Sequence, residues 1–182
     1  MEIVTIIPNR IYSIRYDGEE IAEYYRLFNK EWTDVDFLMD FFQSHPEFTE
    51  NAFWGFLSND PEIASARVIK DANFLETHLK ELANNSDNGT TPDLEDYFEP
   101  LEGKYFYELD LTPMKGYGTL EASFLRLYAI RVEHNCFLIV YGGIKLNDKI
   151  QNSPVLIENV FRKIDSVRQF LKDEGITDGE DL

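Results

Sequence analysis

Arg126 is the residue of this sequence whose type and surroundings best suit chemistry on an anion. It lies within 124–132, an apolar run typical of a β-strand, and a second such run follows after a tight turn. If Val132 lies opposite Cys136, the alternation of side chains along the strands places Arg126 across from Gly142. A guanidinium that faces a residue without a side chain has room to bind a carboxylate or a phosphate. A structural ion pair with one of the many acidic residues is the alternative.

The other residues with ligand-forming or reactive side chains favour structural roles. Asp34, Asp36 and Asp40 could hold a hard cation, but acidic side chains are also favoured beside a helix start by the helix dipole. The three histidines lie in different predicted elements, which favours surface or capping roles. Cys136 begins an apolar strand without a basic neighbour, which favours burial over a reactive thiol. We therefore expect neither a metal nor an organic cofactor.

The common catalytic motifs are absent. The sequence contains no G-x-S-x-G, no H-E-x-x-H, no P-loop and no G-x-G-x-x-G pattern, so acyl-transfer and nucleotide-binding functions have no motif to support them. The Lys115-Gly116-Tyr117-Gly118 stretch is expected to form a turn. The single cysteine excludes an internal disulfide and a zinc site built from cysteines.

The elements that must position Arg126 are those of an α+β chain. Two short β-type runs at 2–7 and 11–16 open the sequence, helical patterns follow, and strands and a last helix come after them. This order predicts an antiparallel sheet with the N-terminal helices packed on it and a C-terminal helix. Further predicted elements are a helix headed by Thr33 with Asp36 as its capping-box partner, a short helix at 48–56, a long helix opened by Asp60-Pro61, a strand at 105–111, and a last helix opened by Ser153-Pro154.

The composition predicts one acidic domain with a sizeable core. The chain has 182 residues, of which 43% are hydrophobic and 14% aromatic, so most of it can fold. We expect a single domain over 1–182, made of an acidic helical segment at 19–83, a flexible acidic loop at 84–100, and a β-sheet plus C-terminal helix at 101–175. The loop is predicted because a polar run rich in Asn and Asp ends the pattern of the long helix.

The charge of the chain limits its partners. Its net charge of −17 repels phosphate backbones and anionic membranes at long range, and it also favours solubility. The negative charge is concentrated in residues 1–100, which hold 7 Lys and Arg against 21 Asp and Glu. No long apolar run and no signal-like N-terminus are present, and together with the single cysteine this predicts a cytoplasmic protein without a membrane contact.

A series of features in 125–175 carries a family resemblance. The segments are Leu125-Arg126-Leu127-Tyr128, Cys136-Phe137-Leu138-Ile139-Val140-Tyr141-Gly142-Gly143-Ile144-Lys145, Lys149, Ser153-Pro154, and Phe170-Leu171-Lys172. With this arginine-bearing strand, apolar strand, basic end and Ser-Pro helix start, the stretch resembles the C-terminal part of the RelE superfamily of toxins, most closely its HigB-like, phage-associated branch. The resemblance implies a RelE-like core that carries a large helical insertion.

The resemblance also implies an activity. Members of the superfamily are metal-independent endoribonucleases that cut messenger RNA, commonly on the ribosome, and they neutralise the developing phosphate charge with Arg and Lys. By matching position, the catalytic cations here would be Arg126, Lys145 and Lys149. The implied partners are a small DNA-binding antitoxin and messenger RNA or the ribosome. The chain would be such a toxin or a relative that has lost catalysis.

Three functions therefore remain open. The nuclease predicts a local cationic patch despite the overall charge. A non-enzymatic interaction domain, whose acidic helices bind a basic partner, predicts that Arg126 is held in a buried ion pair and that no open basic cleft exists. An acidic mimic of nucleic acid predicts carboxylates spaced like phosphates on one surface.

Overall fold

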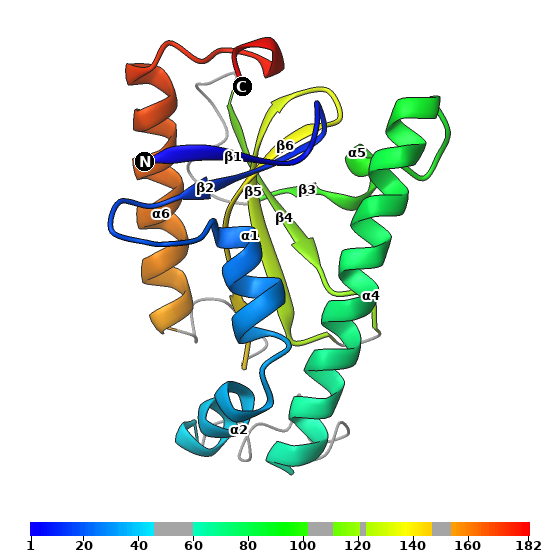
Figure 1. The fold of residues 1–182 in the computed structure, drawn as a ribbon, viewed down its shortest axis with the longest axis vertical. Helices are drawn as coiled ribbons and strands as arrows, with labels where there is room; N and C mark the ends of the chain where they lie inside the picture. Colours follow the sequence, from blue (N-terminus) through cyan, green and yellow to red (C-terminus); the bar gives the residue numbers. More distant parts are fainter. Residues whose placement is uncertain (46–59, 102–110, 121–122, 147–153) are drawn as a thin grey trace.

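The computed structural model describes residues 1–45, 60–101, 111–120, 123–146 and 154–182. A six-stranded sheet forms the middle of the molecule, with helices on both faces (Figure 1). The strand order is β1-β2-β6-β5-β4-β3. The strands are β1 (Glu2–Ile7), β2 (Ile11–Arg15), β3 (Glu99–Pro100), β4 (Thr112–Tyr117), β5 (Leu125–Glu133) and β6 (Cys136–Ile144). The α+β class is confirmed.

The strand pairing differs in one place from the antiparallel sheet that the sequence predicts. Most neighbouring strands are antiparallel, but β2 and β6 run parallel, with Ser13 paired to Ile139. The N-terminal hairpin thus joins the sheet beside β6, the last strand among the described residues. A pairing between segments so far apart leaves no local signal in the sequence, so its direction could not be predicted.

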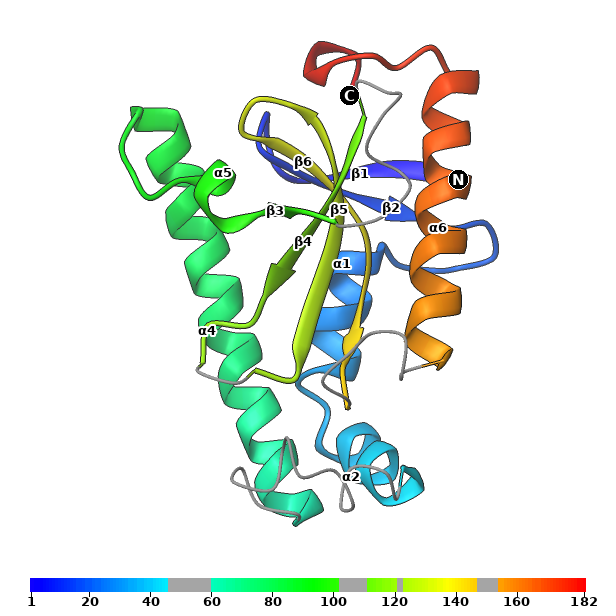
Figure 2. The same ribbon diagram turned by 180° about the vertical axis from the view of Figure 1, so that it is seen from behind.

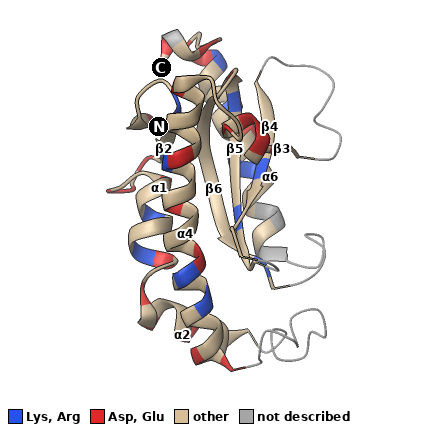
Figure 3. Ribbon diagram, turned by 90° about the vertical axis from the view of Figure 1, so that its right-hand side faces the viewer, with Lys and Arg blue, Asp and Glu red and all other residues tan. Residues whose placement is uncertain are grey.

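The helices form two layers. They are α1 (Glu23–Arg26), which continues into the π-helical turn η1 (Leu27–Glu31), α2 (Val35–Ser44), α4 (Pro61–Asn88), α5 (Leu94–Tyr97), α6 (Pro154–Asp173) and the short 3-10 turn η5 (Gly179–Asp181). Figure 3 shows the sheet edge-on, with α1, α2 and α4 on one side and α6 on the other. None of the described helices combines the length and the apolar composition that a membrane-spanning helix needs.

Local signals explain where the helices begin. Asp60 caps α4 by accepting a hydrogen bond from the backbone N–H of Glu62, and Pro61 occupies the first turn, as predicted. The cap of α2 is Asp34, which accepts from the N–H of Phe37 at 2.8 Å. The predicted Thr33 cap was therefore wrong by one residue, because the Thr33 hydroxyl donates to the backbone carbonyl of Phe28 at 2.7 Å and Asp34 supplies the capping acceptor.

Each face of the sheet has its own apolar core. The core under α4 contains its stripe Val68, Ala72, Leu75, Leu79 and Leu82, and the core under α6 contains Val160, Ile164, Val167 and Leu171. Residues of β5 and β6 alternate between the two cores, so the hairpin is covered on both sides, as its apolar composition predicts.

The register of the β5–β6 hairpin shifts along its length. Ile130 pairs with Leu138, as expected, but Glu133 rather than Val132 pairs with Cys136. A second shift between Tyr128 and Ala129 brings Arg126 opposite Gly143 instead of Gly142. Two β-bulges cause these differences, because each inserts one extra residue into one strand of the pair.

Two segments have structures that differ from those expected from the sequence. The stretch expected to turn at 115–118 continues β4 through Tyr117, because β4 pairs with β5 along its whole length. The segment 84–100, expected to be a flexible loop, contains the last turn of α4, then α5 with a capping box at Asp93, and β3. The predicted helix at 48–56 and residues 105–110 of the predicted strand lie outside the described residues.

Candidate functional site

Arg126 is held by its own loop. Its Nη1 donates hydrogen bonds to the carbonyl oxygens of Ser123 at 2.8 Å and Leu125 at 2.6 Å. Its guanidinium carbon lies 4.6 Å from the centre of the Tyr117 ring, which is cation–π distance. Among the described residues no carboxylate forms an ion pair with Arg126, so the buried ion pair expected for an interaction domain is not found there, and backbone carbonyls take its place. Burial lowers the pKa of this guanidinium, with a smaller opposing contribution from Tyr128.

Of the other two predicted cations, Lys145 and Lys149, the structure describes only Lys145. Lys145 follows β6, and its backbone N–H donates to the carbonyl of Phe124 at 2.8 Å, so Lys145 and Arg126 lie at the same end of the hairpin. The Lys145 residue is half-buried. Lys149 lies outside the described residues. The structure therefore brings together the chain positions of two of the three predicted cations.

Many of the described cations are neutralised by carboxylates. The ion pairs are Arg10 with Asp87, Arg15 with Glu2, Arg26 with Glu23 and Glu31, Lys80 with Glu76, Lys115 with Glu99, Arg131 with Glu95, and Lys163 with Glu23. Such pairing lowers the positive potential that a phosphate backbone would meet.

A buried carboxylate joins the two helical layers. Glu23, at the start of α1, is 3% exposed and accepts a hydrogen bond from Nε of Arg26 at 3.0 Å and one from Nζ of Lys163 on α6 at 3.4 Å. The Lys163 ammonium also lies 4.7 Å from the centre of the Tyr141 ring. Burial lowers the pKa of Lys163, and the charge of Glu23 opposes that effect. Glu31 also pairs with Arg26, so the cluster holds two carboxylates and two cations, and this balanced charge favours a structural role.

Cys136 is buried, as the sequence indicates. Burial raises the pKa of its thiol to about 11, and the charge of Glu133 adds to the effect. A thiol with this pKa is protonated at neutral pH and is a poor nucleophile.

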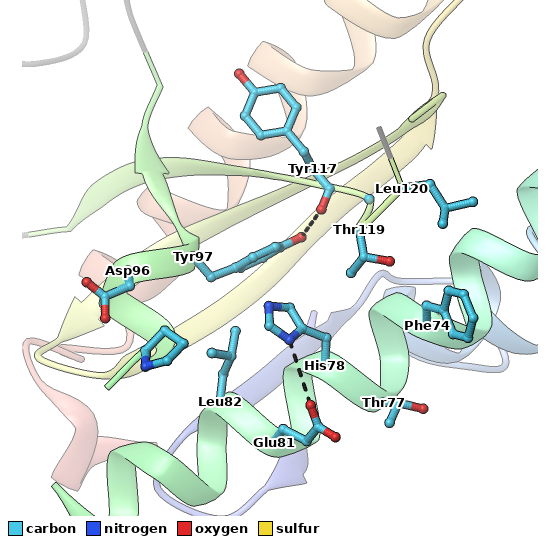
Figure 4. Close-up of a pocket in the computed structure, with 12 residues that line it drawn as sticks. Phe74, Thr77, His78, Glu81, Leu82, Asp96, Tyr97, Tyr117, Thr119 and Leu120 are labelled. Atoms are coloured by element: carbon cyan, nitrogen blue, oxygen red, sulfur yellow. Dashed lines mark hydrogen bonds and ion pairs between the residues drawn. The ribbon is translucent and has the colours of Figure 1, made fainter. Parts of the chain in front are cut away.

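A pocket of about 670 Å³ opens between α4 and the residues that follow β4 (Figure 4). The rings of Phe74 and Tyr97 line it, together with His78 and Glu81, whose Nδ1 and Oε2 atoms lie 3.9 Å apart. The Tyr97 hydroxyl donates a 2.7 Å hydrogen bond to the backbone carbonyl of Tyr117, so it ties the floor of the pocket to the end of β4.

Asp71 fixes the far wall of this pocket. Its side chain is buried on α4, and Oδ1 accepts hydrogen bonds from the backbone N–H groups of Thr119 at 2.7 Å and Leu120 at 3.0 Å. Its Oδ2 accepts from the hydroxyl of Ser123. A Cβ atom at Gly118 would overlap this carboxylate, so the wall passes Asp71 at a distance that only glycine permits.

Arg126 and Asp71 thus hold the same segment from two sides. The Ser123 carbonyl accepts from Arg126, and the Ser123 hydroxyl donates to Asp71. Sequence reasoning missed Asp71 and the pocket. The available signal was an acidic residue next to the apolar stripe of α4, beside Ala72, where an apolar side chain is usual.

Comparison of the chain with protein families, with curated proteins and with solved structures found no match in any of the three.

Proposed function

We propose that the protein is a cytoplasmic, non-enzymatic binding domain whose acidic helices take a basic segment of a partner protein. One observation carries the proposal. The guanidinium of Arg126, the best candidate for binding a phosphate, is engaged by two backbone carbonyls and by the Tyr117 ring. Nη1 and one face of the guanidinium are thus used to stabilise the loop, which favours a structural role for Arg126.

The binding surface is proposed at the end of the helical layer where α2 packs beside the first turns of α4 (Figures 1 and 2). Exposed carboxylates gather on these elements: Asp34, Asp36, Asp40 and Glu62. Large apolar side chains are exposed among them: Val35 at 57%, Phe37 at 38% and Ile63 at 51%. We call these seven residues the acidic–apolar end.

This mixture favours an amphipathic basic partner. The apolar side chains supply buried area on binding, and the carboxylates select lysine and arginine and steer their approach. The helix α2 itself contains neither Lys nor Arg, so its negative charge is not locally cancelled along its own length.

The experiment measures binding of a lysine-rich amphipathic helical peptide by calorimetry, with a glutamate-rich peptide of the same apolar pattern as the control. We expect binding of the lysine peptide alone, weakened by added salt because the carboxylates are exposed. The variant Asp36→Asn with Asp40→Asn should bind more weakly than Glu19→Gln with Glu20→Gln, which removes the same charge from an exposed loop outside the acidic–apolar end. Equal binding by the two double variants would refute the surface.

The ribonuclease toxin is the second candidate, because Arg126 and Lys145 lie at the same end of the hairpin. A cell-free translation reaction with one defined messenger tests it, with RNA ends mapped by primer extension. Cuts that appear with the parent protein and disappear with a folded Arg126→Ala, Lys145→Ala variant would support the nuclease. If the messenger stays intact at high protein concentration, the nuclease is refuted and the binding domain is the proposal that stands.

A further inference from the structure

The pocket beside α4 has the size of a small-molecule site. Its volume of about 670 Å³ lies within the usual range for ligand pockets, and its lining is largely aromatic and aliphatic with a few polar groups. Figure 4 shows His78 on α4 pointing toward Tyr97, with Phe74 on the same helix and Thr119 on the opposite side. The pocket lies outside the acidic–apolar end, so it is not part of the surface proposed above.

The carboxylates that line the pocket make it acidic. Glu81 and Asp96 line it and are exposed, and none of the described residues that line it is Lys or Arg. The carboxylate of Asp96 accepts a hydrogen bond from the backbone N–H of Asp93 at 3.0 Å, which leaves Glu81 as the acidic group open to a ligand. The imidazole of His78 lies 3.9 Å from the Glu81 carboxylate. An anionic ligand would meet two carboxylates, whereas a cationic ligand would be attracted to them.

The rings of the pocket suit the same kind of ligand. Phe74 is 49% exposed, which is unusual for a residue of this size, and the ammonium of Lys70 lies 5.6 Å from the centre of its ring, so this ring already attracts a cation. Aromatic faces attract cations and stack with planar rings. The hydroxyl of Tyr97 donates to the Tyr117 carbonyl, and its ring meets the rings of His78 and Phe98 edge-on, with centroids 6.1 Å and 4.8 Å away.

The pocket is also formed before any ligand arrives. Asp71 holds the Thr119–Leu120 wall through two backbone hydrogen bonds, and Arg126 holds the adjoining Ser123 carbonyl. A wall fixed in this way does not need to be ordered on binding, which removes one cost of association.

We propose that this pocket binds a small aromatic amine, with the ring of the ligand beside Phe74 and its ammonium group beside Glu81. The proposal concerns a function additional to the binding of a basic protein segment. Neither depends on the other, because they use different residues.

The test uses tryptamine as the probe and indole-3-propionate as the ring-matched anion, in heteronuclear NMR titrations of the whole chain at neutral pH. Tryptamine should shift the amide signals of Thr77, His78, Thr119 and Leu120 at concentrations where indole-3-propionate does not. The variants Glu81→Gln and Phe74→Leu change exposed residues and keep the fold, and each should weaken tryptamine binding about threefold or more. Asp40→Asn removes one carboxylate from the acidic–apolar end and should leave tryptamine affinity unchanged.

Three results would overturn the proposal. They are equal binding of the amine and the anion, no shift of the wall amides with millimolar tryptamine, and unchanged tryptamine affinity in Glu81→Gln. Loss of lysine-peptide binding in Asp36→Asn with Asp40→Asn, with normal tryptamine binding, would separate the two proposals.

Discussion

The buried carboxylate of Asp71 accepts a 2.7 Å hydrogen bond from the backbone N–H of Thr119 and so ties the middle of α4 to the end of β4. Leu120 and Ser123 donate to the same carboxylate. A helix in one layer and a loop at the end of a strand are thereby held as one unit. The wall of the pocket depends on this unit rather than on local turn chemistry.

Replacing Asp71 with Ala should destabilise the protein. The change leaves the N–H groups of Thr119 and Leu120 without their acceptor in a partly buried site, and hydrogen bonds to a charged group contribute about 1.5–3 kcal/mol each. We expect the free energy of unfolding, measured with urea, to fall by about 3 kcal/mol or more. The exposed Asp40→Ala should change it by no more than about 0.5 kcal/mol. Equal effects of the two substitutions would show that Asp71 has no such role.

Replacing Arg126 with Lys should loosen the loop without removing the positive charge. An ammonium cannot reproduce the planar guanidinium that lies over Tyr117 while it donates to Ser123 and Leu125. We expect a loss of about 1–2 kcal/mol in unfolding free energy, together with shifted amide signals at Thr119 and Leu120. Arg162→Lys, on the exposed side of α6, is the matched control and should alter neither. A fully stable Arg126→Lys protein would mean that only the charge matters.

Replacing Glu23 with Gln should break the cluster that joins α1 to α6. Arg26 and Lys163 would then lie close together without their shared carboxylate, and removing one partner of a buried ion pair costs about 3–5 kcal/mol. Urea unfolding measures the effect. The exposed Glu19→Gln is the control, and the second change Lys163→Met in the Glu23→Gln background should recover part of the loss. A Glu23→Gln protein as stable as the control would contradict a structural role.

Stability should fall at alkaline pH because of buried tyrosines. Burial raises the pKa of Tyr16, Tyr24 and Tyr97 above the ordinary value of 10.0. A raised pKa in the folded state gives stability that is complete below the pKa of the unfolded chain and is lost as pH rises toward the folded value. When the absorbance of tyrosinate is followed during an alkaline titration, only part of the tyrosines should ionise near pH 10. The buried tyrosines should ionise only at the higher pH at which the protein unfolds. Complete titration with native circular dichroism would contradict this expectation.

The sequence predicts the elements with strong local signals. Asp60 and Pro61 mark the start of α4, its apolar stripe lies in the core, and the β5–β6 hairpin forms where two apolar runs flank a tight turn. Each of these features depends on neighbours in the chain. The α+β class follows from their order.

The candidate site was predicted less well, for two physical reasons. The partner of Arg126 depends on β-bulges, and one extra residue in β6 is enough to exchange Gly142 for Gly143. The pocket depends on Asp71 meeting residues about fifty positions later, and the sequence does not reveal such a contact. An arginine in an apolar strand gives the same sequence pattern whether its guanidinium binds a ligand or nearby backbone carbonyls, so the sequence does not distinguish the two roles.

The parallel pairing of β2 with β6 also affects how the chain can be made. Ser13 and Ile139 lie 126 positions apart. At ribosomal rates of about 5–20 residues per second, β2 waits roughly 6–25 s before its partner emerges. During synthesis the apolar residues Ile11 and Ile14 therefore have no sheet to enter, and nascent chains that stop before β6 expose them together with an open strand edge. Truncated forms of this protein should for that reason depend on chaperones more than the finished chain does.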